Sequence, residues 1–210
     1  LLDSRGITDP AQLPPGHPYR GVAEEIQTFE EYSWLYHDSW SRPHVRWLLS
    51  TVPTMMILDD HDLRDDWNTS QPWRDRVTAQ PWWRERVVGA FGSYWVYQHL
   101  GNLPPQAAHE TFQRIRSADE AEASRILVEL AERADVVSDS GQWSFSRDLG
   151  TDGCRIRFVA IDSRGSRQLT PGRRRMVDEQ EWAWIRDAIN PPGTRIDHLL
   201  VGTSLPVFML

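Results

Sequence analysis

A short apolar run that ends in a dense acidic cluster constrains this chain more than any other stretch. Residues 53–68 read PTMMILDDHDLRDDWN, and the run at 55–58 has the length and composition of a buried β-strand. Five aspartates follow within eight residues: Asp59, Asp60, Asp62, Asp65 and Asp66. Because like charges this close repel one another, a folded chain keeps such a cluster only if something neutralises it.

A bound cation is one way to neutralise the cluster. Carboxylate oxygens and the imidazole nitrogen of His61 are ligands for hard and borderline divalent metals. Sites in open α/β sheets also form just beyond the carboxyl ends of strands, which is where the cluster falls. The alternative is a solvated acidic turn or a helix N-cap, since aspartate favours both. The motif Asp-Asp-His-Asp by itself leaves both interpretations open.

Size and composition are those of an ordinary soluble globular protein. The chain has 210 residues, of which 40% are hydrophobic and 25% charged, enough for one domain with a real core. No apolar stretch approaches the roughly 20 residues that cross a bilayer. No signal peptide is visible, so localisation is unknown, and a cytoplasmic location is favoured only on that ground. The net charge of −7 argues against a surface that coats nucleic acid or anionic membranes.

Helical and strand-like segments alternate along the chain, which predicts an α/β fold. After a turn-rich arm at residues 1–19, the apolar spacing predicts helices at 28–40, 44–50, 73–80, 81–100, 111–134 and 178–189. Besides the run at 55–58, strands are expected in a hairpin around 143–146 and 155–161, and at 196–201. Three of these strands end in polar groups, so the sequence predicts a sheet edge lined by site residues.

Four of these segments, taken in order, resemble the PhoD-like (alkaline phosphatase D) metallophosphatases, a branch of the calcineurin-like phosphoesterases. Members typically have an aromatic helix, then a proline and an apolar strand running into Asp-Asp-His-Glu or Asp-Asp-His-Asp, then Asn and Trp; residues 29–68 match this order. Residues 162–167 (DSRGSR) stand where the family has Asp-Thr-Arg-x-x-Arg, and residues 178–184 (DEQEWAW) resemble its Glu/Gln-x-x-Trp helix. Residues 202–206 (GTSLP) resemble its next metal-side segment. Agreement of four motifs in order is far more specific than any one.

The resemblance implies an α/β, calcineurin-like metallophosphoesterase sandwich, incomplete at both ends and carrying helical insertions. We expect an irregular arm at 1–28 and the central part of a PhoD-like domain at 29–210, with a helical insertion at about 73–134. The family's first metal-ligand segment, a strand ending in Gly-Asp, has no match in residues 1–28, and its C-terminal Asp-x-His segment would lie beyond residue 210. We therefore expect a fragment that is not competent alone, with the remaining metal ligands outside these 210 residues.

The implied activity is metal-dependent hydrolysis of phosphate monoesters or diesters, with divalent or trivalent cations, two in number, as cofactors. Calcium, iron, manganese and zinc are not distinguished. By resemblance Asp60 is a metal ligand, and Asp59 is either a second ligand or an orienting group. His61 would face the leaving-group oxygen, since imidazole exchanges protons near neutral pH. Asp62 would hold His61 in orientation, unless it is only a helix N-cap.

The second strand end supplies the expected phosphate contacts. Arg164 is the candidate phosphate clamp, because a guanidinium binds two phosphate oxygens in its fork; a salt bridge to Asp162 is the alternative. Arg167 is a second candidate for substrate binding, and Asn68 is expected to contact phosphate or metal or to form an Asx turn. Ser204 stands where many relatives place a metal-binding histidine, and serine is a poor ligand.

Two readings of a different class stand beside the enzyme. A non-catalytic binding or scaffolding module would keep the phosphoesterase fold without turnover, and an acidic calcium-binding domain would use metal for stability alone. The partner expected for the enzyme is a small phosphate ester, and the sequence identifies no partner chain.

Overall fold

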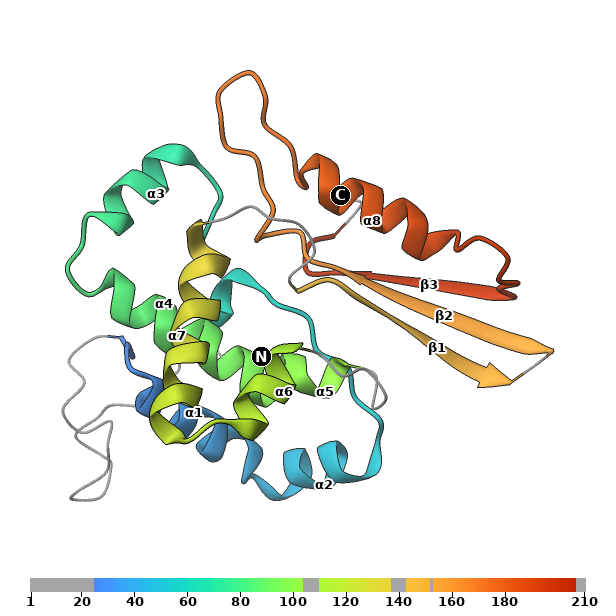
Figure 1. Cartoon of the computed structure of the whole chain (residues 1–210), viewed down its shortest axis with the longest axis horizontal. Coiled ribbons are helices and arrows are strands. Elements are labelled where there is room, and N and C mark those ends of the chain that lie inside the picture. Colours follow the sequence, from blue (N-terminus) through green and yellow to red (C-terminus); the bar gives the residue numbers. More distant parts are fainter. Residues whose placement is uncertain (1–24, 104–109, 137–142, 152, 207–210) are drawn as a thin grey trace.

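The computed structural model describes residues 25–103, 110–136, 143–151 and 153–206, so the arm predicted at 1–19 lies outside the described residues. Within them the fold is mixed α/β. Helices α1 to α7 gather into one body, and a small three-stranded sheet with helix α8 extends from it (Figure 1). No helix in these described ranges is both long and apolar enough to span a bilayer.

Helices α1 (Phe29–Trp40) and α2 (Pro43–Thr51) confirm the first two predicted helices. Thr28 caps α1 through a capping box: its Oγ1 accepts from the backbone N–H of Glu31 at 3.2 Å, and Glu31 Oε2 accepts from the backbone N–H of Thr28 at 2.9 Å. Pro43 begins α2, a position where its missing N–H costs nothing.

The central helix of the core runs through three consecutive segments. They are α4 (Trp83–Tyr94), a π-helical turn η4 (Trp95–His99) and α5 (Leu100–Asn102). The helix predicted at 81–100 is confirmed, and the π turn within it was not predicted. A Cβ on Gly89 would lie 2.3 Å from the backbone oxygen of Gln27, so α4 packs directly against the chain that enters α1.

Three more helices surround this core: α3 (Gln71–Thr78), α6 (Glu110–Ser117) and α7 (Glu120–Val136). The prediction of a single helix at 111–134 is wrong in one respect, because α6 ends at Ser117 and a second helix follows. Asp119 Oδ1 caps this second helix by accepting from the backbone N–H of Glu122 at 2.9 Å. Ile126 and Ala131 of α7 are buried, so this helix belongs to the core rather than to a peripheral lid.

The sheet confirms the predicted hairpin and the last predicted strand. Strand β1 (Phe145–Thr151) pairs antiparallel with β2 (Cys154–Ile161), and β2 pairs parallel with β3 (His198–Thr203). Helix α8 (Glu179–Ile189), predicted at 178–189, crosses from β2 to β3 and contacts β2, and Asp178 caps it. Because β2 and β3 are parallel, the residues that follow them emerge at the same edge of the sheet.

The strand predicted at 55–58 is wrong, since these residues form no ladder in the described part of the chain. The segment is nevertheless extended and ends in the fully buried Leu58. The side-chain amide of Asn102 satisfies both polar groups of Met56: Met56 N donates to Asn102 Oδ1 at 2.9 Å, and Asn102 Nδ2 donates to Met56 O at 2.6 Å. One carboxamide therefore makes the pair of hydrogen bonds that a neighbouring strand would make.

Candidate active site

The acidic cluster is folded into a tight 3₁₀ turn, η3 (Asp60–Asp62), which follows the extended segment. The backbone of Asp66 has φ 64° and that of Asn68 has φ 58°, a left-handed conformation that aspartate and asparagine tolerate better than other side chains. This bend brings the N–H of Asp66 to Asp60 Oδ2 at 3.0 Å. The left-handed residues thus return the chain over Asp60 and fix one of its two carboxylate oxygens.

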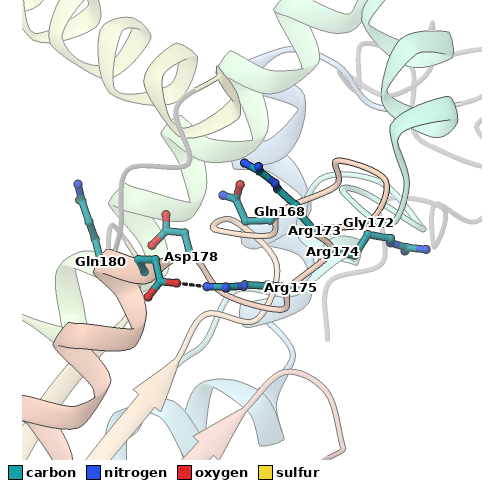
Figure 2. Close-up of a pocket in the computed structure, with 8 residues that line it drawn as sticks. Gln168, Gly172, Arg173, Arg174, Arg175, Asp178 and Gln180 are labelled. Atoms are coloured by element: carbon teal, nitrogen blue, oxygen red, sulfur yellow. Dashed lines mark hydrogen bonds and ion pairs between the residues drawn. The ribbon is translucent and has the colours of Figure 1, made fainter.

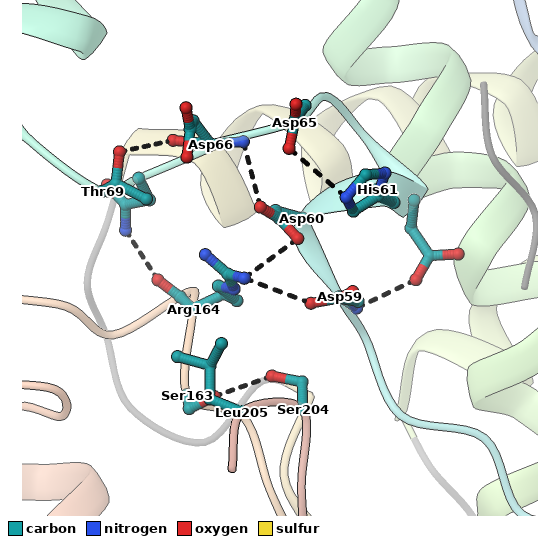
Figure 3. Close-up of polar contacts among 12 residues, drawn as sticks. Asp59, Asp60, His61, Asp65, Asp66, Thr69, Ser163, Arg164, Ser204 and Leu205 are labelled. Atoms are coloured by element: carbon teal, nitrogen blue, oxygen red, sulfur yellow. Dashed lines mark hydrogen bonds and ion pairs between the residues drawn. The ribbon is translucent and has the colours of Figure 1, made fainter. Parts of the chain in front are cut away.

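Arg164, from the loop after β2, meets the acidic turn across the sheet edge. Its Nη2 lies 3.0 Å from Asp60 Oδ1 and 3.4 Å from Asp59 Oδ1 (Figure 3). The Asp162 carboxylate accepts from the backbone N–H of Arg164 at 2.8 Å and of Gly165 at 3.0 Å. Asp162 therefore shapes the loop backbone, while the guanidinium pairs with the acids of the other motif.

Asn68 and Arg167, both predicted to bind substrate, join the two loops. Asn68 Nδ2 donates to the carbonyl of Arg164 at 2.7 Å and of Gly165 at 3.3 Å. Arg167 donates from Nε to the carbonyl of Ser163 at 2.8 Å and from Nη1 to the carbonyl of Asn68 at 3.4 Å. Burial lowers the pKa of Arg167, and the nearby charge of Arg164 lowers it further. These contacts position Arg164, and they leave Asn68 Nδ2 engaged with backbone oxygens.

Two buried polar atoms at the junction make no hydrogen bond with any described residue. They are Oδ1 of Asp60, the oxygen beside Arg164 Nη2, and Nε of Arg164 itself. Asp60 is 4% exposed and Arg164 7% exposed, so bulk water does not easily satisfy them. Burial is the main cause that raises the pKa of Asp60, a second is its hydrogen bond with Asp59, and Arg164 lowers it. Asp60 Oδ1 has the ion pair with Arg164 and no hydrogen bond, and Arg164 Nε has no acceptor among the described residues, so the junction could take a cation beside Asp60 and an anion beside Arg164.

His61 is held by a different acid from the one expected. Its Nε2 lies 3.3 Å from Asp65 Oδ1, and the two residues are four positions apart (Figure 3). Asp62, expected to orient His61, instead accepts from the backbone N–H of Asp59 and from Gln98 Nε2, both at 2.9 Å. The η3 turn causes this, because it points the Asp62 carboxylate back at the residue that precedes the turn. Burial raises the pKa of Asp62 to about 6.

Asp65 is the residue that sequence reasoning did not assign a role. One ligand atom each of Asp60, His61 and Asp65 lies within 4.8 Å of the others. Donor atoms that bind a single cation at about 2.0–2.5 Å are separated by distances of this size, so the three side chains fit one ion. Asp59 is outside this set and pairs with Arg164. The four-residue spacing from His61 was the available signal for Asp65.

A pocket of about 300 Å³ adjoins His61 on the side of the helical body. Asp59, His61, Asp62 and Gln98 are the polar residues of its wall. The rest of its wall is apolar and comes from α1, α2 and the extended segment: Trp40, Val45, Leu49, Met56 and Ile57. The pocket is thus lined by acids and an imidazole together with hydrocarbon.

The end of β3 also reaches the sheet edge that Arg164 lines. Ser204 Oγ lies 2.7 Å from Ser163 Oγ, in the residue just before Arg164 (Figure 3). Ser204 therefore supports the Arg164 loop, and its hydroxyl is used in that contact. The predicted convergence of the second and third strand ends is confirmed, because the parallel pairing of β2 and β3 requires it.

A scan of protein-family models, a search of curated proteins and a search of solved structures each found no match to this chain.

Proposed function

We propose that this chain is part of a metal-dependent phosphoric ester hydrolase of the PhoD-like, calcineurin-like type, with a sandwich fold of which the small sheet forms part. The observation that carries the proposal is the contact of Arg164 with Asp59 and Asp60. Asp59 and Arg164 lie 105 residues apart in the sequence, so the fold brings together two motifs that the resemblance assigns to one site. At that meeting point a buried carboxylate oxygen and a buried guanidinium N–H make no hydrogen bond with any described residue. A cation and a phosphoryl oxygen would satisfy them together.

The cation would be held by Asp60 and Asp65, whose oxygens face a common point with His61. When bound, it would supply Lewis-acid polarisation of the phosphoryl group. Arg164 would donate from Nε to a phosphoryl oxygen, while Asp59 and Asp60 fix the guanidinium from the other side. A preorganised donor of this kind does not have to reorient as charge develops.

His61 would donate a proton to the leaving-group oxygen, and Asp65 would orient its imidazole. The pocket beside His61 would receive the alcohol part of the ester, and its hydrocarbon wall suits an aryl or alkyl group. His61 could instead be a ligand of the cation, because one of its ring nitrogens lies within 4.8 Å of ligand atoms of Asp60 and Asp65. One imidazole nitrogen cannot serve both uses at once, so metal content of a His61 variant separates them.

One observation favours the alternative, a non-catalytic module that retains the fold. Arg164 already offsets part of the charge of Asp59 and Asp60, so these two acids do not need a metal to coexist. Such a module would hold no stoichiometric metal and would not turn over phosphate esters. The cluster that Asp65 forms with Asp60 and His61, and the Nε of Arg164, which has no acceptor among the described residues, favour the enzyme.

The test uses the full-length protein with p-nitrophenyl phosphate and bis(p-nitrophenyl) phosphate, before and after chelation. We expect chelator-sensitive release of p-nitrophenolate, and losses of about 10²-fold or more in His61→Ala and Arg164→Gln. His198→Ala, at an exposed position of β3, and Arg116→Gln, at an exposed position of α6, are the matched controls and should keep their activity. A protein that purifies without stoichiometric metal and shows no turnover belongs to the alternative.

A further inference from the structure

The loop between β2 and α8 is strongly basic in an acidic protein. Residues 163–177 contain five arginines and no aspartate or glutamate, whereas the whole chain has a net charge of −7. Two of the five, Arg164 and Arg167, belong to the candidate active site. The other three are consecutive, Arg173, Arg174 and Arg175, and all three are exposed. A local excess of guanidinium groups on such a background favours an anionic ligand.

Backbone hydrogen bonds give this loop a defined shape. Gln168 and Arg175 exchange both of their backbone hydrogen bonds, at 3.0 Å and 3.1 Å, so the loop closes on itself like a short hairpin. Within it the N–H of Arg173 donates to the carbonyl of Thr170 at 2.9 Å. In Figure 1 the loop projects between the end of β2 and the start of α8. The three arginines are therefore presented on an ordered turn.

The basic loop is continuous with the active-site arginines. Arg167 Nη1 donates to the carbonyl of Asn68 at 3.4 Å, and Arg174 Nη2 donates to the carbonyl of the next residue, Thr69, at 2.8 Å. The guanidinium groups of Arg167 and Arg174 thus lie against consecutive carbonyls of one segment. Asn68 in turn donates to the carbonyl of Arg164. A row of three arginines leads from the Asp60 contact to the exposed turn.

A cavity of about 650 Å³ opens beside this turn, with Gln168, Arg173, Arg174 and Arg175 in its wall (Figure 2). Glu179 also lines the cavity, and it forms an ion pair with Arg175. Arg173 and Arg174 form no ion pair with a carboxylate of any described residue. Asp178 lines the cavity as well, so its wall carries three guanidinium groups against two carboxylates, and in the described ranges Arg173 and Arg174 are the two that no ion pair engages.

We propose that this cavity binds a second anionic group of the substrate, a phosphate or carboxylate on the part of the molecule that the enzyme retains. The inference rests on the proposed function for the position of the scissile phosphate. In Figure 3, Thr69, which Arg174 contacts, and His61, which serves the leaving group, lie on opposite sides of Asp60. Substituents would extend from the phosphorus atom in both directions. The substrate class is thus a phosphodiester or phosphoanhydride whose retained side carries another anion.

The test compares two diesters that release the same p-nitrophenolate: ethyl p-nitrophenyl phosphate and 2-(phosphonooxy)ethyl p-nitrophenyl phosphate. We expect kcat/KM of the full-length protein to be about tenfold higher for the second, because two charge-assisted contacts at an exposed site have about this effect. The double variant Arg173→Gln/Arg174→Gln should abolish this preference, and its kcat/KM for the ethyl diester should stay within about twofold of that of the unaltered protein. Arg173→Gln alone, whose side chain carries no loop contact in the described residues, should reduce it several-fold, and Arg116→Gln should not change it.

Equal kcat/KM for both diesters in the unaltered protein would overturn the proposal, as would a preference that survives the double substitution. If neither these diesters nor p-nitrophenyl phosphate is hydrolysed, the proposed function fails, and the cavity is then tested by binding in the presence of EDTA. The probes are ethane-1,2-diyl bisphosphate and ethyl phosphate, measured by titration calorimetry. Tighter binding of the bisphosphate that is lost in Arg173→Gln/Arg174→Gln supports an anion site, and equal binding overturns it. The difference should shrink at high salt.

Discussion

The side-chain amide of Asn68 joins the two halves of the candidate site, because its Nδ2 lies 2.7 Å from the carbonyl oxygen of Arg164. The same residue has φ 58° and is 5% exposed. Its position therefore depends on two properties at once: a tolerance of left-handed backbone and a carboxamide that can reach the other loop. Asn68 thus fixes the backbone of Arg164, and the acidic turn engages its guanidinium.

Substitutions at Asn68 separate these two properties. Asn68→Gly keeps the backbone conformation and removes the hydrogen bonds, so we expect a loss of about 1–2 kcal/mol in the free energy of unfolding. Asn68→Ala removes the bonds and adds the left-handed backbone cost, for a further loss of about 1 kcal/mol. Urea denaturation of both variants measures the difference. An Asn68→Ala variant no less stable than Asn68→Gly would contradict the role of backbone conformation.

Asp62 should make stability depend on pH. Its pKa is raised to about 6 from an ordinary value of 3.8, chiefly by burial, so the folded protein holds this proton more tightly than the unfolded chain. The free energy of unfolding therefore falls as pH rises from about 4 through about 6, and the Asp62 contribution amounts to about 2 kcal/mol between pH 4.5 and pH 7.5. Asp62→Asn should flatten the profile by this amount in chemical denaturation across that range. An unchanged slope would show that Asp62 is already ionised in the acidic turn.

His61→Ala distinguishes the two uses of His61 in the proposed enzyme. If His61 serves the leaving group, the variant should retain its metal and lose about 10²-fold or more in kcat. Asp65→Asn should lower both metal content and turnover, since Asp65 contacts His61 and also shares the cation position. Elemental analysis of the purified variants, alongside steady-state kinetics, gives the answer. Loss of metal from His61→Ala would make the imidazole a ligand.

Gly89→Ala should destabilise the core. The new Cβ would lie 2.3 Å from the backbone oxygen of Gln27, and a backbone atom cannot move aside without shifting the start of α1. We expect a loss of about 2–3 kcal/mol in the free energy of unfolding. Gly101→Ala is the matched control, because a Cβ there has no neighbour within 4 Å and alanine favours the helix. Thermal unfolding should show a lower Tm only for Gly89→Ala.

Local signals predicted the helices and the hairpin well. The helices predicted at 28–40 and 178–189 begin within one residue of the observed starts, where Thr28 and Asp178 cap them, and Gly153 lies in the turn between β1 and β2. Asp59, Asp60 and Arg164, which meet at the site, were named from the sequence, whereas Asp65 was not; Arg164 and Ser204 meet because the ends of β2 and β3 share one edge of the sheet. What the sequence could not supply was the partner of the run at 55–58. An apolar run is equally compatible with a ladder and with an extended segment, and here a single side chain, that of Asn102, replaces the ladder.

The pairing inside the acidic cluster was also beyond sequence reasoning. Five aspartates so close together offer many combinations, and the outcome depends on the 3₁₀ turn at Asp60–Asp62 and the left-handed bend at Asp66. The first sends Asp62 to Asp59 and Gln98, and Asp65 is the acid that contacts His61.

The π turn at Trp95–His99 sets the phase between the core helix and the acidic loop. A π turn accommodates one residue more than an α-helical turn. If the same residues formed a regular α-helix instead, every residue that follows would be rotated by about 100° around the helix axis. The carboxamide of Asn102 would then face away from Met56, and the extended segment leading to Asp59 would lose its anchor. The π turn in this buried helix therefore determines where the acidic residues lie.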